Sequence, residues 1–580
     1  MEILNPSFGK EDVANYCESA HFAYTVLSDN HWDRDELWQN KCEIAMHVFC
    51  LNCIHDGGYW TDIKLPHDRV NKQRKRSARN DDLVAMPTMD GPEPQSMTEA
   101  RTWHTDSEKY VAAGEKEMSG HYKNGTFVPC EMPVDAIPID TKLFFVRKTE
   151  EPSAEYPDGI RHKGRLVARG FSQVDGQNFN WDTVFAPVLR AASIRWLFSL
   201  AAQKGWSMSG SDVVQAFLQA DLKNDEHDSN LQDVYIRLPD GCEYTCPKTG
   251  KVFKYARLQK ALYGLKQAPK RWNVTLSEFL TKKLGFVQHE KDPCVYQLVR
   301  GKDVLILGVY VDDLIKVTNC DKLRCTVDGI LNEKFEITHS GNLNEFLGMK
   351  LTYKTTPDGR RYLDVSQEKY VEKILKRFQL HDCNIKSTPS ASNTYLTPRE
   401  QDASTNDPEY VNMYRQMVGA LIHLVVLTRP DIAYDVSAAS VFMSNPSGDH
   451  TSALVRIFRY LRGTSDYTLK YFDIFPNILS LTGFVDSNFA GDYDTRSVTG
   501  FLFTSGSGLV SWLSKRQPTI STSASHAECT AFFHAVKETI MHRDCLEHFK
   551  FQNIVLQAPT IIYGDNSACI QVTSKQNSMG

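Results

Sequence analysis

The sequence has no strong charge of either sign, no long apolar run and no clear metal-binding cysteine pattern. Its 580 residues carry a formal net charge of −5, so any affinity for nucleic acid must come from local basic patches or metal-filled acidic sites. No apolar run approaches the roughly 20 residues that a bilayer requires, and the opening residues do not resemble a signal peptide. One CxxC, Cys50 and Cys53, has no second pair at zinc spacing. We therefore expect an intracellular protein with free thiols and no membrane contact.

The length and the hydrophobic pattern predict several domains of α/β class. Residues 1–92 carry no usable motif, and their basic run 69–79 fits either a targeting patch or a solvated linker. From 93 to 355 helical and strand patterns alternate, and 366–465 is mostly helical by period. From 478 onward strands are followed by a helix and a strand, the order of a compact α/β module. We expect boundaries that give domains 1–92, 93–355, 356–470 and 471–580.

Two adjacent aspartates interrupt one apolar stretch. In "LILGVYVDDLIKV" (305–317), Asp312 and Asp313 stand between two apolar, β-branched runs, which predicts a β-hairpin. An ordinary turn also explains the pair, because Asp is a common turn residue. Asp212, far upstream, would supply a third carboxylate, and Mg²⁺ prefers such oxygen ligands. Because consecutive strand residues point to opposite faces, we expect both members of the pair at the turn itself.

Longer motifs around these acids resemble a known family. The segments "SDVVQAFLQADL" (211–222), "LQKALYGLKQAPKRW" (258–272) and "YVDDL" (310–314) are similar, in the same order, to the polymerase of copia-type LTR retrotransposons. The resemblance covers residues 93–580. It implies a right-hand polymerase with fingers, palm and thumb, then a helical connection and an RNase H-like domain. It also implies an RNA-directed DNA polymerase that extends a DNA primer on an RNA or DNA template with dNTPs and Mg²⁺.

The resemblance assigns the metal ligands and the contacts to the triphosphate. Asp212, Asp312 and Asp313 become the palm metal ligands, with Val213 offering a backbone carbonyl. Taken alone, Asp212 is better explained as a helix N-cap, but the match of all three acids overturns that interpretation. Two residues of a basic run match the positions that contact the triphosphate, and a solvated basic loop is the alternative. These two residues are Lys163 and Arg165.

Further substrate contacts follow from the same resemblance. Phe217 matches the aromatic position that excludes a 2′-hydroxyl, which implies dNTP over NTP, whereas periodicity alone makes it a core residue. Gly264, Lys266 and Gln267 lie in a segment that backs the nascent base pair and template, with Gly264 allowing a close backbone approach. Tyr310, directly before the acidic pair, is the remaining substrate-binding residue that the resemblance implies.

A second set of acids resembles an RNase H domain. Asp486, Glu528 and Asp565 are expected on a strand, a helix and a strand, where clustered acids would hold Mg²⁺ for cutting RNA in an RNA–DNA hybrid. Singly, each would be a cap or a surface residue. The family usually has an acid where His526 stands, and the sequence stops before the segment of the fourth acid. We therefore expect a nearly complete fold with impaired cleavage.

No Asp-Thr-Gly or Asp-Ser-Gly triplet and no integrase-type zinc pattern occurs in the sequence. The chain therefore resembles the polymerase end of a retrotransposon Pol polyprotein, acting in the cytoplasm within a virus-like particle, in the nucleus, or in both. A catalytically dead remnant that binds nucleic acid or nothing is the alternative.

Overall fold

The computed structural model describes residues 93–103, 105–149, 156–222, 233–391, 395–400, 406–473, 481–505, 507–549 and 559–574. The expected N-terminal domain 1–92, with its basic run, and residues 575–580 lie outside this part of the chain. The described residues form two compact units. The smaller unit holds 93–186 and 215–275, and the larger unit holds 187–214 and everything described from 276 onward. The larger unit takes up residues 187–214 because they supply a strand to its central sheet.

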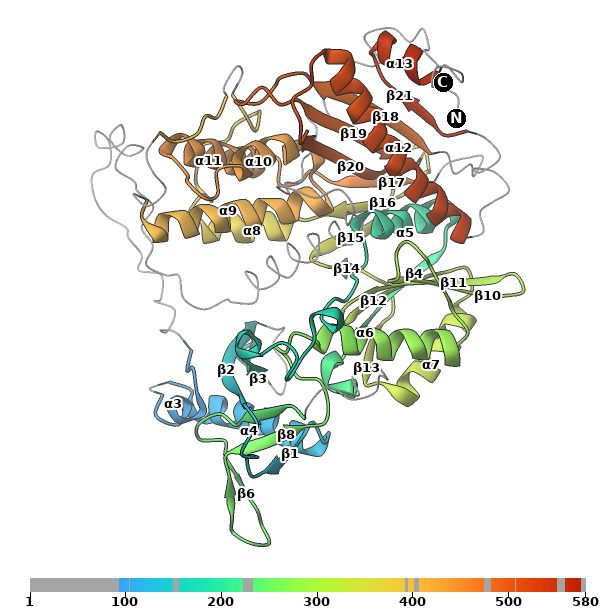
Figure 1. The fold of residues 1–580 in the computed structure, drawn as a ribbon. Coiled ribbons are helices and arrows are strands. Elements are labelled where there is room, and N and C mark those ends of the chain that lie inside the picture. Colours follow the sequence, from blue (N-terminus) through green and yellow to red (C-terminus); the bar gives the residue numbers. More distant parts are fainter. Residues whose placement is uncertain are drawn as a thin grey trace. The chain divides into compact units, whose positions relative to one another are not determined.

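The smaller unit is a five-stranded sheet covered by one long helix (Figure 1). Helix α4 packs on strands β2 and β3, and the approach is close, because a side chain at Gly164 would lie 2.9 Å from the carbonyl oxygen of Ala113. The alternating residues of β2 and β3 that face α4 join one apolar core. The strand order is β1 (Phe127–Cys130), β8 (Tyr255–Leu258), β5 (Tyr235–Arg237), β2 (Ile139–Thr149) and β3 (Ile160–Ala168), with helices α3 (Met97–Arg101) and α4 (Ser107–Lys123) and the hairpin β6 (Tyr244–Thr245) and β7 (Val252–Phe253).

The larger unit is built around a six-stranded antiparallel sheet. Its central strands are buried along most of their length, as expected for apolar runs covered on both faces. Helix α5 (Ala191–Lys204) covers one face, where Leu197 meets Gly308, and α7 (Asp321–Lys334) covers the other. The strand order is β13 (Ile337–Ser340), β4 (Ser207–Val213), β12 (Asp313–Thr318), β11 (Asp303–Tyr310), β10 (Val295–Arg300) and β9 (Val287–Gln288). Helix α6 (Ala268–Glu278) leads from the smaller unit into the larger one.

A second sheet follows, and next to it lies the layer of helices that the periodicity of residues 366–465 predicted. Strand β17 comes from much later in the chain and pairs with β16. The expected domain boundary at 355/356 falls in the loop between β15 and β16, which also pair with each other. Four helices pack beside one another next to this sheet (Figure 1). The strands are β14 (Glu345–Phe346), β15 (Met349–Thr355), β16 (Arg361–Ser366) and β17 (Leu469–Phe472), and the helices are α8 (Glu368–Arg377), α9 (Pro408–Leu427), α10 (Ala433–Ser440) and α11 (Gly448–Gly463).

The C-terminal part is a four-stranded sheet with α12 packed on it. Its order of strands, helix and strand confirms the predicted module, and β18 and β21 are parallel neighbours. The strands are β18 (Thr482–Asn488), β19 (Val498–Thr504), β20 (Leu509–Arg516) and β21 (Ile561–Tyr563), and the helices are α12 (Ala524–His548) and α13 (Ser567–Ser574). The mixed α/β class predicted for the chain is confirmed.

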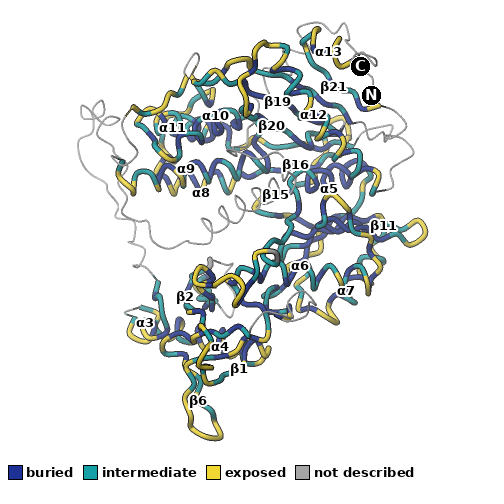
Figure 2. Tube along the Cα trace, in the orientation of Figure 1, coloured by how far each residue is buried: buried dark blue, intermediate teal, exposed yellow. Residues whose placement is uncertain are grey.

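Helix α5 is buried on all sides and joins the central sheet to the C-terminal module (Figure 2). Arg195 donates hydrogen bonds to the carbonyl oxygens of Val510 (2.7 Å) and Val426 (2.6 Å), and its guanidinium lies 3.8 Å from the Trp512 ring. Trp196 donates to Nδ1 of His542 at 2.9 Å. The residues around the central sheet and the C-terminal module therefore share one interior.

Candidate active site

The tip of the β11–β12 hairpin carries the acidic pair. Tyr310 and Asp313 are cross-strand partners, which leaves Val311 and Asp312 as a two-residue turn. Val311 has a φ of 55°, a conformation that a β-branched residue adopts only at a cost of order 1–3 kcal/mol. The expectation that both aspartates lie in the turn is wrong in one respect, because Asp313 is the first residue of β12. The tightest hairpin needs only two turn residues, and a valine fills one of these places.

The third aspartate lies across from this tip. Strand β4 pairs with β12 so that Asp212 is opposite Asp313, and paired residues of antiparallel strands point to the same face. The N–H of Val213 donates to the carbonyl oxygen of Asp312 at 2.9 Å, which fastens β4 to the turn. Asp212 is therefore a strand residue and not a helix N-cap. The structure brings the three acids together from two distant segments, and the backbone-carbonyl role of Val213 stays a prediction.

The electrostatics of this face favour a cation. Burial, and then the charges of Asp312 and Asp212, raise the pKa of Asp313 to about 7. Like charges directly opposite each other on paired strands are destabilising. A hard divalent ion prefers such carboxylate oxygens and would reduce the repulsion among these three charges. Tyr310 ends β11 beside them with a buried side chain.

The predicted triphosphate contacts lie on a strand of the smaller unit and not in a solvated loop. Lys163 and Arg165 belong to β3, two residues apart, so they point to the same face, opposite to the face that α4 covers. The guanidinium of Arg165 lies 5.5 Å from the ring of Tyr263, and Phe217 packs on the same ring with a centroid distance of 4.9 Å. Tyr263 belongs to the motif at 258–272, but the sequence did not predict that its ring would lie between Arg165 and Phe217, because that placement depends on the fold.

The loop before α6 is held by contacts within the protein. Gly264 has a φ of 88°, and a side chain there would lie 2.0 Å from the carbonyl oxygen of Ala168. The close approach expected of Gly264 is therefore to the end of β3. Lys266 places its ammonium 4.1 Å from the Phe179 ring, with the exposed Trp181 ring at 5.1 Å.

Gln267 is a buried member of the same loop. Its amide donates to the carbonyl oxygen of Asn178 and accepts from Nε2 of Gln173, both at 2.9 Å, and its side chain is 3% exposed. These bonds give it a role in holding the loop. Its contact with a substrate stays a prediction.

The second acid set also converges. Asp486 on β18, Glu528 on α12 and Asp565, two residues beyond β21, each place a carboxylate oxygen within 4.8 Å of the others. The expectation of a strand position for Asp565 is thus off by two residues, because β21 ends at Tyr563. The parallel pairing of β18 and β21 sets their carboxyl ends side by side. In the part of the chain that the structure describes, this is the one group of three acidic, histidine or cysteine residues with such spacing.

Glu528 is the most constrained of these acids. Its Oε1 accepts from the backbone N–H and the hydroxyl of Ser487, both at 3.0 Å. Burial, and then the charge of Asp486, raise the pKa of Glu528 to about 7, and burial and Asp565 raise the pKa of Asp486. A buried carboxylate group of this kind fits a divalent cation. His526, where the family usually has an acid, is exposed at the start of α12.

A sheet with paired aspartates at a hairpin tip, followed by a second acid cluster on a C-terminal α/β module, is an arrangement that could hold divalent ions at two places. Residues 124–392 match the family model described as "Reverse transcriptase (RNA-dependent DNA polymerase)". Residues 124–392 therefore form a reverse transcriptase domain of this family, and the relatives described below are retrotransposon Pol polyproteins. The predicted resemblance is confirmed.

Two plant proteins illustrate the relationship. The chain is 34% identical over 520 residues to the "Retrovirus-related Pol polyprotein from transposon TNT 1-94" of Nicotiana tabacum, covering 89% of this chain and 37% of that protein. It is 34% identical over 415 residues to the transposon RE2 Pol polyprotein of Arabidopsis thaliana, covering 70% of this chain and 26% of that protein. The chain thus spans about a quarter to two fifths of these relatives.

A solved foamy viral protease-reverse transcriptase in complex with double-stranded DNA aligns with a TM-score of 0.41 and 13% identity, covering 80% of this chain and 64% of that chain. Within the described residues, no helix is both long and apolar enough to span a bilayer.

Proposed function

We propose that this chain is an RNA-directed DNA polymerase that extends a DNA primer with dNTPs on an RNA or DNA template. The observation that carries the proposal is the placement of Asp212 opposite Asp313, with Asp312 in the adjoining turn. These three side chains would hold Mg²⁺. When bound, the ions would activate the primer hydroxyl and stabilise charge on the leaving pyrophosphate.

The remaining residues would bind and orient the substrates. Lys163 and Arg165 would neutralise the negative charge of the triphosphate while staying protonated themselves. Phe217, supported by Tyr263, would restrict the sugar to a deoxyribose. Template recognition would depend on backbone and A-like shape, since copying cannot depend on sequence.

Residues 93–355 would form fingers and palm, 356–470 thumb and connection, and 471–580 the RNase H-like domain. Such an enzyme would act in the cytoplasm, within a virus-like particle, or in the nucleus, with other parts of a Pol polyprotein.

Primer extension on an RNA template with Mg²⁺ tests the proposal. Incorporation of dNTPs is expected to fall by about a hundredfold or more in Asp312→Asn, because several kcal/mol of charge stabilisation is lost. Asp303→Asn, at the other end of β11, is the matched control and is expected to retain activity. If the wild-type chain extends a primer no better than Asp312→Asn, the chain is a catalytically dead remnant.

A second activity is favoured by the spacing of Asp486, Glu528 and Asp565. We infer that this cluster would hold divalent ions and cut RNA in an RNA–DNA hybrid, with water as the nucleophile and with the impaired activity expected from the sequence. Gel analysis of a labelled hybrid tests this inference. Cleavage by the wild type that disappears in Glu528→Gln supports it, and a wild type that leaves the hybrid intact contradicts it.

A further inference from the structure

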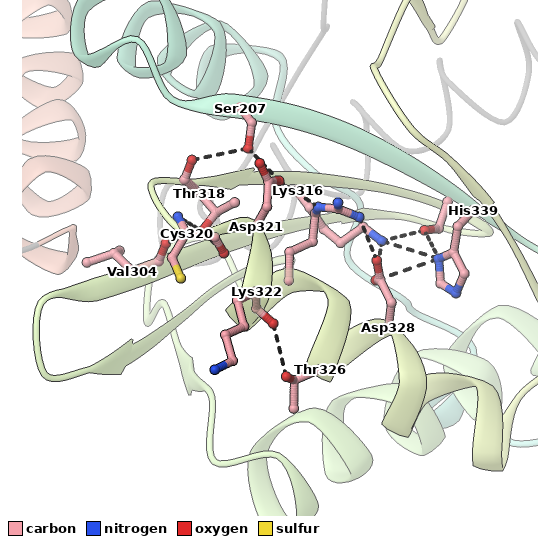
Figure 3. Close-up of polar contacts among 12 residues, drawn as sticks. Ser207, Val304, Lys316, Thr318, Cys320, Asp321, Lys322, Thr326, Asp328 and His339 are labelled. Atoms are coloured by element: carbon pink, nitrogen blue, oxygen red, sulfur yellow. Dashed lines mark hydrogen bonds and ion pairs between the residues drawn. The ribbon is translucent and has the colours of Figure 1, made fainter.

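A charged network lies buried beneath the strands that carry the acids. Lys316 on β12 has no exposed surface, and its ammonium donates to two side-chain oxygens and lies close to an imidazole nitrogen (Figure 3). Its Nζ lies 2.5 Å from Oδ1 of Asp328 on α7, 2.6 Å from the hydroxyl of Ser211 on β4, and 3.4 Å from Nδ1 of His339 on β13. Four elements of the larger unit are therefore joined at one nitrogen atom.

The hydrogen-bond directions around Lys316 form one consistent chain. The ammonium donates to the Ser211 hydroxyl, which can then donate to Nδ1 of His339 at 2.7 Å. Nε2 of His339 lies 3.1 Å from the side-chain oxygen of Asn332 and can donate to it. Arg324 donates to the second carboxylate oxygen of Asp328 at 3.1 Å. Burial lowers the pKa of both Lys316 and His339, so a neutral imidazole suits these bonds.

The network and the acids occupy opposite faces of the same two strands. Ser211 directly precedes Asp212, and Lys316 lies three residues after Asp313, so alternation places each on the reverse of the sheet from its acid. On one face of β4, the hydroxyl of Ser211 accepts a hydrogen bond from Lys316. Asp212 lies on the other face of the same strand. A shift of β4 against β12 would break the Ser211–Lys316 bond.

Stability alone does not explain a buried charge at this position. Replacing a buried ion pair by apolar residues of similar volume is often neutral or stabilising, because the desolvation cost disappears. A fixed direction of hydrogen bonds is what a charged network adds over an apolar core. Partners behind metal ligands commonly orient those ligands, and their loss typically costs 10–100-fold in metal affinity or activity.

We propose that Lys316, with Asp328, Ser211 and His339, is a positioning residue that fixes β4 against β12 and so sets the separation of Asp212 and Asp313. The proposal rests on the proposed polymerase function for its catalytic readout. Its metal-binding readout is independent of that function.

The decisive variant is the double substitution Lys316→Met and Asp328→Leu, which removes both charges and keeps the volume. We expect a Tm close to that of the wild type, a kcat for dNTP incorporation lowered by about tenfold or more, and a nearly unchanged KM for dNTP. Binding of Mn²⁺, followed by electron paramagnetic resonance in a Glu528→Gln background to remove the second cluster, is expected to weaken by about tenfold. Lys354→Met is the control for the loss of a lysine–aspartate pair, because Lys354, whose side chain is 49% exposed, pairs with Asp364 on β15 and β16, in another sheet.

Ser211→Ala is the second variant, in case the double substitution does not fold, and its Mn²⁺ affinity is expected to fall in the same direction. Wild-type Mn²⁺ affinity in a folded double variant, or in Ser211→Ala, would overturn the proposal. A wild-type chain that binds Mn²⁺ but incorporates no dNTP would instead count against the proposed function alone, and the loss of Mn²⁺ affinity in the variants would still support the positioning role.

Discussion

The raised pKa of Asp313 predicts that the metal-free protein becomes less stable as the pH rises. Its pKa is about 7 in the folded chain, whereas an unfolded aspartate has a pKa of about 3.9. The native state therefore favours protonated Asp313. The resulting stabilisation is fully present below about pH 4 and is lost as the pH rises through about 7.

The magnitude follows from the two pKa values. Each pH unit between them lowers the free energy of unfolding by about 1.4 kcal/mol. Between pH 5 and pH 8 the contribution of this one group falls by about 2–3 kcal/mol. Asp313→Asn cannot ionise, so the variant is expected to gain stability relative to the wild type by this amount over the same interval.

Differential scanning calorimetry in EDTA at pH 5 and pH 8 measures the effect as a difference in Tm. At pH 8, Mg²⁺ is expected to raise the Tm of the wild type and to raise that of Asp313→Asn less. Glu290→Gln, an exposed acid in the same unit, serves as the control. If the difference in Tm between wild type and Asp313→Asn is the same at both pH values, the crowding of charge inferred at the hairpin is refuted.

Three further substitutions test other parts of the structure. Arg195→Met leaves buried carbonyl groups without a donor and is expected to lower the free energy of unfolding by about 3–5 kcal/mol, seen as a lower Tm; an unchanged Tm would contradict the burial of α5. Gly264→Ala, whose side chain would collide with the Ala168 carbonyl, is expected to abolish primer extension, whereas Gly250→Ala, also at positive φ but in open space, is expected to retain it; equal activities would exclude the collision. Glu528→Gln is expected to lose hybrid cleavage and keep dNTP incorporation, and a parallel loss of both would show that the two acid sets are not independent.

The sequence was most informative where chemistry leaves a short motif. The acids of both sets were predicted from their resemblance to family motifs, and the structure brings each set together. The exact places of Asp313 and Asp565 were not predicted. A turn and a strand end differ by one or two residues, and side-chain pattern does not resolve that difference.

Interactions between distant segments were out of reach of the sequence. Lys316 is a single charged residue in the otherwise apolar stretch 314–317. Nothing in the sequence around it predicts a contact with Asp328 or His339. The insertion of Tyr263 between Arg165 and Phe217 likewise depends on how β3 meets the loop before α6. Such contacts are set by packing, which composition and periodicity do not specify.

Helix α5 has a consequence for how the chain is made. Its Arg195 bonds to a strand that leaves the ribosome 315 residues later. At about 5–20 residues per second, that interval is roughly 15 to 60 s. During this time, Arg195 and Trp196 of α5 lack their partners in the C-terminal module. The nascent chain must therefore avoid misfolding until that module has been synthesised. Chaperone occupancy on the translating ribosome should therefore rise after α5 emerges and fall once β20 is complete.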